Sequence, residues 1–334
     1  MPNNSKRKRI KKKSKGSRKK SRELNTVLKI YDSMINQTDQ INSVIMKSLW
    51  RFSYKNRNIY YIFIGEYHFE DDGDKDIVDI IKPYFKQNQK IDLFVEAFFS
   101  EWVLKQKKNK FRLLDKWNDS DIPLVKLRKF ALENMDKSKN FRFHLTDHRS
   151  FCNSIVSLYK MIREIHLPNE DEDTRPYVES MVFKMLDSMI EQINIEYDIL
   201  FDRTKKQILK NEDKNLQQIL ISFHKQTKLS IKKLEKIIDT NKDNIVFKND
   251  NYIKIAKDIF NLQQNIIDNY AFSRMLKQKY HNIRIIYFGG HHIKTFITRL
   301  NILARLLNKT KKYKFTELDR KYISKDAFEL INNL

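Results

Sequence analysis

Two short segments place histidine shortly after glycine, and each segment follows a run of apolar residues. The first is GEYH at residues 65–68, after the run 59–64, and the second is GGHH at residues 289–292, after the run 283–288. Histidine and glutamate side chains transfer protons near neutral pH, and both bind divalent metal ions. Four residues are therefore candidates for proton transfer or metal binding: Glu66, His68, His291 and His292.

Further acidic and imidazole groups follow two other apolar runs. Glu96 follows the run 91–95, and Asp147 and His148 follow the alternating segment 141–145. Ligands of an open parallel sheet bind outside the carboxyl ends of its strands. If the four runs are strands of one such sheet, seven groups are expected at one edge: Glu66, His68, Glu96, Asp147, His148, His291 and His292.

The pattern of apolar residues predicts the elements that must position these groups. The run 59–64 is β-branched and aromatic, which is typical of a central strand covered on both faces. Residues 76–85 have the spacing of a helix that Pro83 is expected to break, and residues 91–95 are predicted to form a second strand. A strand, a helix and a strand at this spacing predict a right-handed parallel crossover, so the residues after both strands reach the same edge.

Most other segments are predicted to be helical. From residue 153 to residue 280 the pattern is helical with breaks, so we expect antiparallel helix hairpins between the third and fourth strands, as an inserted cap or as flanks of the sheet. The predicted elements are one or two helices in 23–52, helices in 98–137 interrupted near 118–123, helices in 153–280 broken near 167–176, near 211 and at 240–250, a helix at 296–307 and an edge strand at 313–317.

The fold class predicted from these elements is α/β, with a mostly parallel central sheet flanked by helices. Residues 1–22 contain twelve Lys or Arg and no acid, so we expect a disordered basic tail that cannot bury enough apolar surface to fold. Residues 23–334 are expected to form a single α/β domain with the helical insertion or cap at about 153–280. The tail holds half of the net charge of +24, and its basic runs fit nuclear targeting or phosphate contacts with nucleic acid as well as a solubilising arm.

The composition predicts a soluble intracellular protein, cytoplasmic or nuclear. The single cysteine, Cys152, excludes an intramolecular disulfide framework, and no apolar stretch approaches the ~20 residues that span a bilayer. The N-terminus lacks the apolar core of a secretory signal, so secretion by that route is not expected.

The motifs together resemble a known superfamily. GEYH, Glu96 and GGHH, with Arg274 in the helical segment 270–275, are similar to the pattern of the superfamily that contains the erythromycin esterases, the haem-uptake protein ChaN, TraB-type proteins and the Tiki proteases. The likeness covers residues 58–100 and 268–300. It implies a set of site residues, with His291 as a neighbour: Glu66, His68, Glu96, Arg274 and His292. GGHH departs from the commoner G-x-G-H form, so both of its histidines remain candidates.

Two hydrolytic mechanisms fit these residue types. In the first, His68, His292 and one carboxylate, Glu66 or Glu96, hold a divalent metal such as Mn, Zn or Co, whose bound water attacks an ester or amide. The other carboxylate is then the general base. In the second, a Glu–His pair activates water directly and Arg274 stabilises the oxyanion. The substrate would be a small molecule or a peptide, and the remaining candidates would surround the reacting groups: Asp147, His148 and His291.

A protein of another class fits the same residues. Its histidines would hold haem or a metal without catalysis, or the chain would be a basic structural protein that contacts nucleic acid through residues 1–22. The sequence thus predicts a hydrolase, with a haem- or metal-binding protein and a nucleic-acid-associated protein as alternatives.

Overall fold

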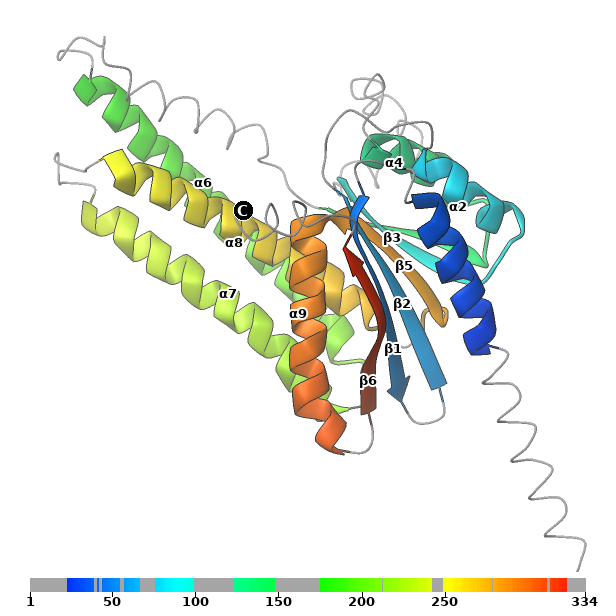
Figure 1. The fold of residues 1–334 in the computed structure, drawn as a ribbon. Helices are drawn as coiled ribbons and strands as arrows, with labels where there is room; N and C mark the ends of the chain where they lie inside the picture. The colour runs from blue at the N-terminus through cyan, green and yellow to red at the C-terminus, as the bar shows by residue number, and fades with distance from the viewer. Residues whose placement is uncertain are drawn as a thin grey trace, which may run out of the picture.

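The computed structural model of the chain is organised around a six-stranded mixed sheet (Figure 1). The strands lie in the order β4-β3-β5-β2-β1-β6. Their bounds are β1 Val44–Tyr54, β2 Arg57–Glu66, β3 Ile91–Phe98, β4 Phe141–Asp147, β5 Ile283–Gly289 and β6 Tyr313–Tyr322. The structure describes residues 23–38, 41, 44–54, 57–66, 76–98, 123–147, 175–211, 213–241, 249–277, 279–310 and 313–322.

Most of the sheet is parallel. Strands β4, β3, β5 and β2 are parallel to their neighbours in that order, whereas β1 is antiparallel to both β2 and β6. The carboxyl ends of β2, β3, β4 and β5 therefore lie along one edge. The predicted α/β class, the central position of residues 59–64 and the parallel relation of β2 to β3 are confirmed, with β5 between those two strands.

Helices cover both faces of the sheet (Figure 1). The helix of residues 23–38, α2 and α4 cover one face, and α9 with the C-terminal part of α8 covers the other. The bounds are 23–38 for the first helix, α2 Ile77–Lys86, α4 Pro123–Asn134, α6 Arg175–Ile208, α7 Lys214–Asn241, α8 Asn249–Met275, α9 Gly290–Leu307 and the 3₁₀ turn η2 Asn308–Thr310.

The two helical layers explain the continuous apolar run in β2. Ile62 and Ile64 pack with the helix of residues 23–38 and α2, whereas Tyr61 and Phe63 pack with α8 and α9. Successive side chains of a strand point to opposite faces, so a strand with both faces covered must be apolar throughout. Burial of each such side chain contributes roughly 1.5–3 kcal/mol to folding.

Helices α6, α7 and α8 contact one another and extend away from the sheet on the α9 side (Figure 1). They share an apolar core that includes Ile190, Leu234 and Ile259. The predicted breaks near residue 211 and at 240–250 are confirmed. The three helices lie between the strands predicted at 141–145 and 283–288, as expected; these strands are the fourth and fifth of the described chain because β1 precedes them.

Two predictions of local structure are wrong. Residues 44–54 form β1 instead of continuing as helix, and they pair with β2 and β6. Leu49 packs on one face of the sheet and Phe52 on the other. Because both faces of β1 are covered, its apolar residues also match the spacing expected for a helix. Pro83 lies inside α2 without ending it. It lacks a backbone N–H, but its carbonyl accepts a 3.0 Å hydrogen bond from the Gln87 backbone N–H, so the last turn of the helix still closes.

The other helices and strands predicted from the sequence agree with the structure where their residues are described. The tail 1–22 and residues 99–122 lie outside the described residues. The helix predicted at 296–307 begins earlier, at Gly290, and the predicted edge strand continues to Tyr322. Among the described helices, none combines the length and the apolar character needed to cross a bilayer.

Candidate active site at the carboxyl edge of the sheet

Strand β5 brings the ends of β2 and β3 to one place. Glu66 ends β2 and pairs in register with Gly289 at the end of β5. On the other side of β5, Glu96 of β3 accepts a 2.7 Å hydrogen bond from the Gly289 backbone N–H through Oε2. Because α9 begins at Gly290, the Glu96 carboxylate lies at the positive end of the α9 helix dipole.

His292 lies between two carboxylates that come from different elements. Its Nε2 is 3.2 Å from Oε1 of Glu96, and its Nδ1 is 2.6 Å from Oδ1 of Asp268 on α8. His292 is 4% exposed, and Glu96 and Asp268 are each 1% exposed. Of the two histidines in GGHH, the second joins the carboxylates, whereas His291 is exposed to solvent.

The two carboxylates determine the protonation state of His292. Burial lowers its pKa, but Glu96 and Asp268 outweigh burial and raise the pKa from 6.5 to about 10. His292 is therefore an imidazolium at neutral pH and donates one hydrogen from each ring nitrogen. A buried imidazolium of this kind can donate a proton or stabilise a developing negative charge.

Arg299 brings a second positive charge close to this cluster. It lies on α9, seven residues after His292, and its guanidinium packs 5.5 Å from the ring centroid of Phe223 and 5.9 Å from that of Phe272. Burial lowers the pKa of Arg299, and the charge of Asp268 opposes that effect. Two carboxylates, one imidazolium and one guanidinium sum to zero, and such compensation is what buried charges require.

Glu66 lies at the same edge but faces the other side of the sheet. The Tyr287 hydroxyl donates a hydrogen bond to Oε2 of Glu66. Tyr287 and Ile64 belong to the core beneath the helix of residues 23–38 and α2, whereas Glu96 is turned toward α9. The edge thus presents one carboxylate on each side of Gly289.

Glycine is required where the two predicted motifs meet. A Cβ atom on Gly65 would lie 3.2 Å from the Cα of Gly290 and 3.5 Å from the Ile293 side chain. That distance to the backbone is shorter than an ordinary contact, so a side chain at position 65 would push α9 away from β2. Gly65 thus permits the backbones of β2 and α9 to approach closely.

The other predicted residues are not part of this cluster as far as the described chain shows. His68 and His148 lie outside the described residues, and Asp147 ends β4 without a described side chain. Arg274 forms hydrogen bonds with the Tyr270 hydroxyl, the Leu145 carbonyl and His144. The catalytic role predicted for Arg274 stays a prediction.

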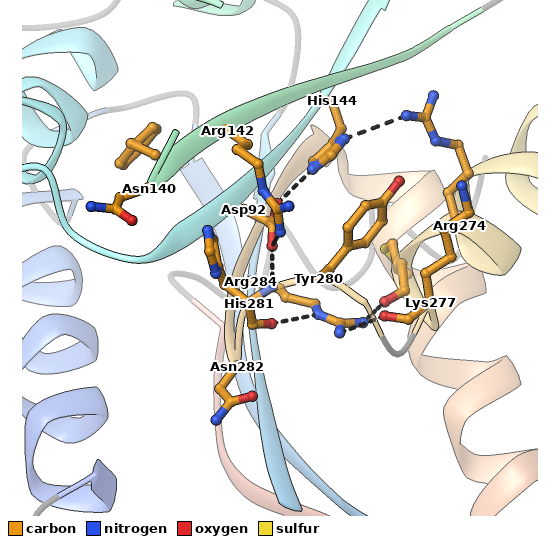
Figure 2. A network of polar contacts seen from close by, with 12 residues as sticks. Asp92, Asn140, Arg142, His144, Arg274, Lys277, Tyr280, His281, Asn282 and Arg284 are labelled. Atoms are coloured by element: carbon orange, nitrogen blue, oxygen red, sulfur yellow. Dashed lines mark hydrogen bonds and ion pairs between the residues drawn. The ribbon is translucent and has the colours of Figure 1, made fainter. Parts of the chain in front are cut away.

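His144 links Arg274 to a second polar network, centred on Asp92 near the start of β3 (Figure 2). The fully buried Asp92 accepts two hydrogen bonds from Arg142 and one from Nε2 of His144, each 2.7 Å long. Burial raises the pKa of Asp92, but the bonds from His144 and Arg142 outweigh burial and lower it to about 2. Burial lowers the pKa of His144 to about 4, so the ring is neutral and its Nδ1 faces Nη2 of Arg274 at 3.4 Å.

Glu96 and His292 are two candidate metal ligands that face each other. The 3.2 Å between Oε1 of Glu96 and Nε2 of His292 fits two ligands of one ion with bonds of about 2.0–2.2 Å. Asp268 holds the other nitrogen of His292, as carboxylates commonly do behind metal-bound histidines. Within the described residues, no group of three His, Cys, Asp or Glu side chains is placed to hold an ion, so a third ligand would have to come from elsewhere, as predicted for His68.

Sequence analysis did not identify Asp268 or Tyr287 as candidate site residues. Asp268 lies in the helical stretch 266–272, among isoleucine, tyrosine and phenylalanine residues. An acid on the buried face of a helix needs a partner, and that is the signal that could have identified it. Tyr287 stands in an apolar strand, where an aromatic residue is expected for packing alone, and no signal marks its hydroxyl.

Comparison of the chain with protein-family models, with curated proteins and with solved structures finds no match. The resemblance to the erythromycin esterase superfamily therefore rests on the sequence motifs.

Proposed function

We propose that this protein is a hydrolase of the erythromycin esterase, TraB and Tiki type, which uses Glu96 and His292 to cleave an ester or amide with water. The supporting observation is the buried arrangement of Glu96, His292 and Asp268. Burying three charged groups is costly, and perturbed groups at the carboxyl edge of an α/β sheet are typical of functional sites.

In this proposal His292 is the proton donor. Asp268 orients the imidazolium, which protonates the leaving oxygen or nitrogen as its bond to the carbonyl carbon breaks. Glu96, which faces His292 at 3.2 Å, accepts a proton from the attacking water as the new carbon–oxygen bond forms. Return of that proton from the carboxylate to His292 restores the starting state, so protons balance over the cycle.

The same residues fit a divalent metal. Glu96 and His292 would hold it, with His68 as the further ligand that the sequence predicts. When bound, Mn, Zn or Co supplies a water molecule of lowered pKa. His292 would then be a neutral ligand, so metal binding would release its proton.

Hydrolysis of a chromogenic panel tests the proposal. The full chain is assayed against nitrophenyl esters and nitroanilides, first with EDTA and then with added Mn, Zn or Co. The panel substrate cleaved fastest should lose at least about 100-fold in rate in Glu96→Gln and in His292→Gln. His291→Ala is the matched control, because this histidine is adjacent in sequence and exposed, and it should keep its activity. Hydrolysis that survives both site substitutions would overturn the proposal.

A further inference from the structure

Positive charge is distributed unevenly among the three helices that extend from the sheet. α7 contains six lysines and two acids. α6 contains five cations and six acids, and α8 contains three of each. Since the three helices share one apolar core, the net positive charge of this layer is concentrated on α7.

Most lysines of α7 lie in one exposed row, which we call the lysine row. It consists of Lys214, Lys225, Lys232 and Lys236, with Lys233 beside them, and all five are exposed. The first four are separated by eleven, seven and four residues. These separations are close to whole turns of a helix with about 3.6 residues per turn. The four side chains therefore share one face of α7 over about 33 Å of its axis.

The lysine row is not neutralised within the part of the chain that the structure describes. None of its five ammonium groups forms an ion pair or a hydrogen bond with a described residue. Lys228, on the flank of α7, differs because it pairs with Asp198 of α6 at 3.1 Å. Of the two acids on α7, Glu235 is half-buried and accepts a hydrogen bond from Asn194, and Asp239 lies beyond the last lysine of the row. The row therefore presents charge of one sign to the solvent.

The spacing of the lysine row suits an extended polyanion rather than a small anion. The first four lysines are separated along the helix axis by about 16.5, 10.5 and 6 Å, so one small anion cannot contact the whole row. A DNA duplex carries one phosphate charge per about 1.7 Å of its axis, so a phosphate is within reach of every lysine. Each lysine that neutralises a phosphate releases condensed counterions, and this release supplies affinity without recognition of base sequence.

Apolar and aromatic side chains are scarce on this face of α7. Leu229 is 61% exposed beside the row, and among the described residues of α7 no other large apolar side chain is exposed. Phe223 is half-buried, with its ring centroid 6.2 Å from that of Phe272. A helix that lies on a membrane needs a broad apolar face beside its cations, and proteins that hold single strands stack the bases on exposed aromatic rings. The lysine row has neither feature.

We propose that the lysine row binds the phosphate backbone of a double-stranded nucleic acid without recognition of base sequence. The supporting observation is a row of exposed, unpaired ammonium groups on one helix face, whose charge complements that of the duplex. This surface is independent of hydrolysis at Glu96 and His292.

Fluorescence anisotropy of a labelled DNA duplex of about 20 base pairs, titrated with the full chain between about 50 and 200 mM KCl, tests this surface. The row variant combines Lys225→Gln, Lys232→Gln and Lys236→Gln, which change exposed side chains and leave the core intact. Its plot of the logarithm of the association constant against the logarithm of the KCl concentration should be less steep than that of wild type by about 2.7, because each lost phosphate contact removes about 0.9 from the slope.

The matched control makes the same change of charge outside the lysine row. It combines Lys184→Gln on α6 with Lys254→Gln and Lys257→Gln on α8, all at exposed positions, and it should keep the wild-type slope. The basic residues 1–22 are retained in every protein, so their attraction for DNA is the same throughout. An equal slope in the row variant and the control variant would overturn the proposal.

Two further arms separate the duplex from other polyanions. A single strand of the same length should bind less tightly than the duplex, because it carries fewer charges per unit length. Vesicles that contain phosphatidylserine should bind the row variant and the control variant equally, since the two have the same net charge. A single strand bound as tightly as the duplex, or a defect of the row variant with vesicles alone, would contradict the assignment to a double-stranded nucleic acid.

Discussion

The buried imidazolium of His292 predicts that this protein loses stability at alkaline pH through a single residue. Its pKa is about 10 in the folded chain, against an ordinary value of 6.5 that we assign to the unfolded chain. Since the folded pKa is raised, the stabilisation is fully present below pH 6.5 and is lost as the pH rises through about 10. The difference corresponds to about 5 kcal/mol, which is comparable to the whole unfolding free energy of a small domain.

Urea unfolding of the full chain between pH 6 and pH 10.5 measures this effect when wild type is compared with His292→Gln. The glutamine amide can donate to one carboxylate but does not titrate. Wild type should be more stable by several kcal/mol at pH 6.5, and the two proteins should converge toward pH 10. Lysines and tyrosines titrate in both proteins, so their contribution cancels in the difference. A stability difference that stays constant from pH 6.5 to pH 10 would refute the assignment of a charged His292.

Three substitutions test other contacts of the structure. Gly65→Ala puts a methyl group 3.2 Å from the Cα of Gly290, so it should lower the unfolding free energy by about 1–3 kcal/mol, and an unchanged urea midpoint would contradict the close approach. Asp92→Asn should cost about 3–5 kcal/mol at pH 7, because it breaks a buried ion pair. Since the pKa of Asp92 is lowered to about 2, that cost should shrink as the pH falls below 3.8, and an equal cost at pH 7 and pH 2.5 would count against the network. Asp268→Asn removes one of the carboxylates that raise the pKa of His292, so an NMR titration should place that pKa at least about one unit lower, whereas an unchanged value would show that Asp268 does not hold the ring.

Sequence patterns placed Glu66, Glu96 and His292 at one edge of the sheet because these residues lie at or just after strand ends. The apolar runs before Glu66 and Glu96, and the helix predicted between them, fixed a parallel crossover and a shared edge. The similarity of the GEYH and GGHH motifs then predicted that His292 lies near the same edge. These inferences needed only periodicity and the handedness of crossovers, both of which are local rules.

Contacts that depend on how helices cross the sheet could not be read from the sequence. Asp268 reaches His292 only because α8 packs beside α9, and Arg274, two turns further along α8, meets His144 of β4 instead. The alternation of side chains also turns Glu66 and Glu96 to opposite faces, which the shared edge alone did not indicate. β1 was mistaken for a helix because its apolar residues serve both faces of the sheet.

The most direct measurement of the central claim is a double-substitution cycle on kcat/KM for the ester or amide that wild type cleaves fastest. The cycle compares wild type, Glu96→Gln, His292→Gln and the double variant, each checked for folding by circular dichroism. If Glu96 and His292 act as one unit, each single substitution should cause nearly the full loss, and the double variant should be no slower than the slower single variant. Losses that multiply in the double variant, or a double variant as active as wild type, would contradict the account.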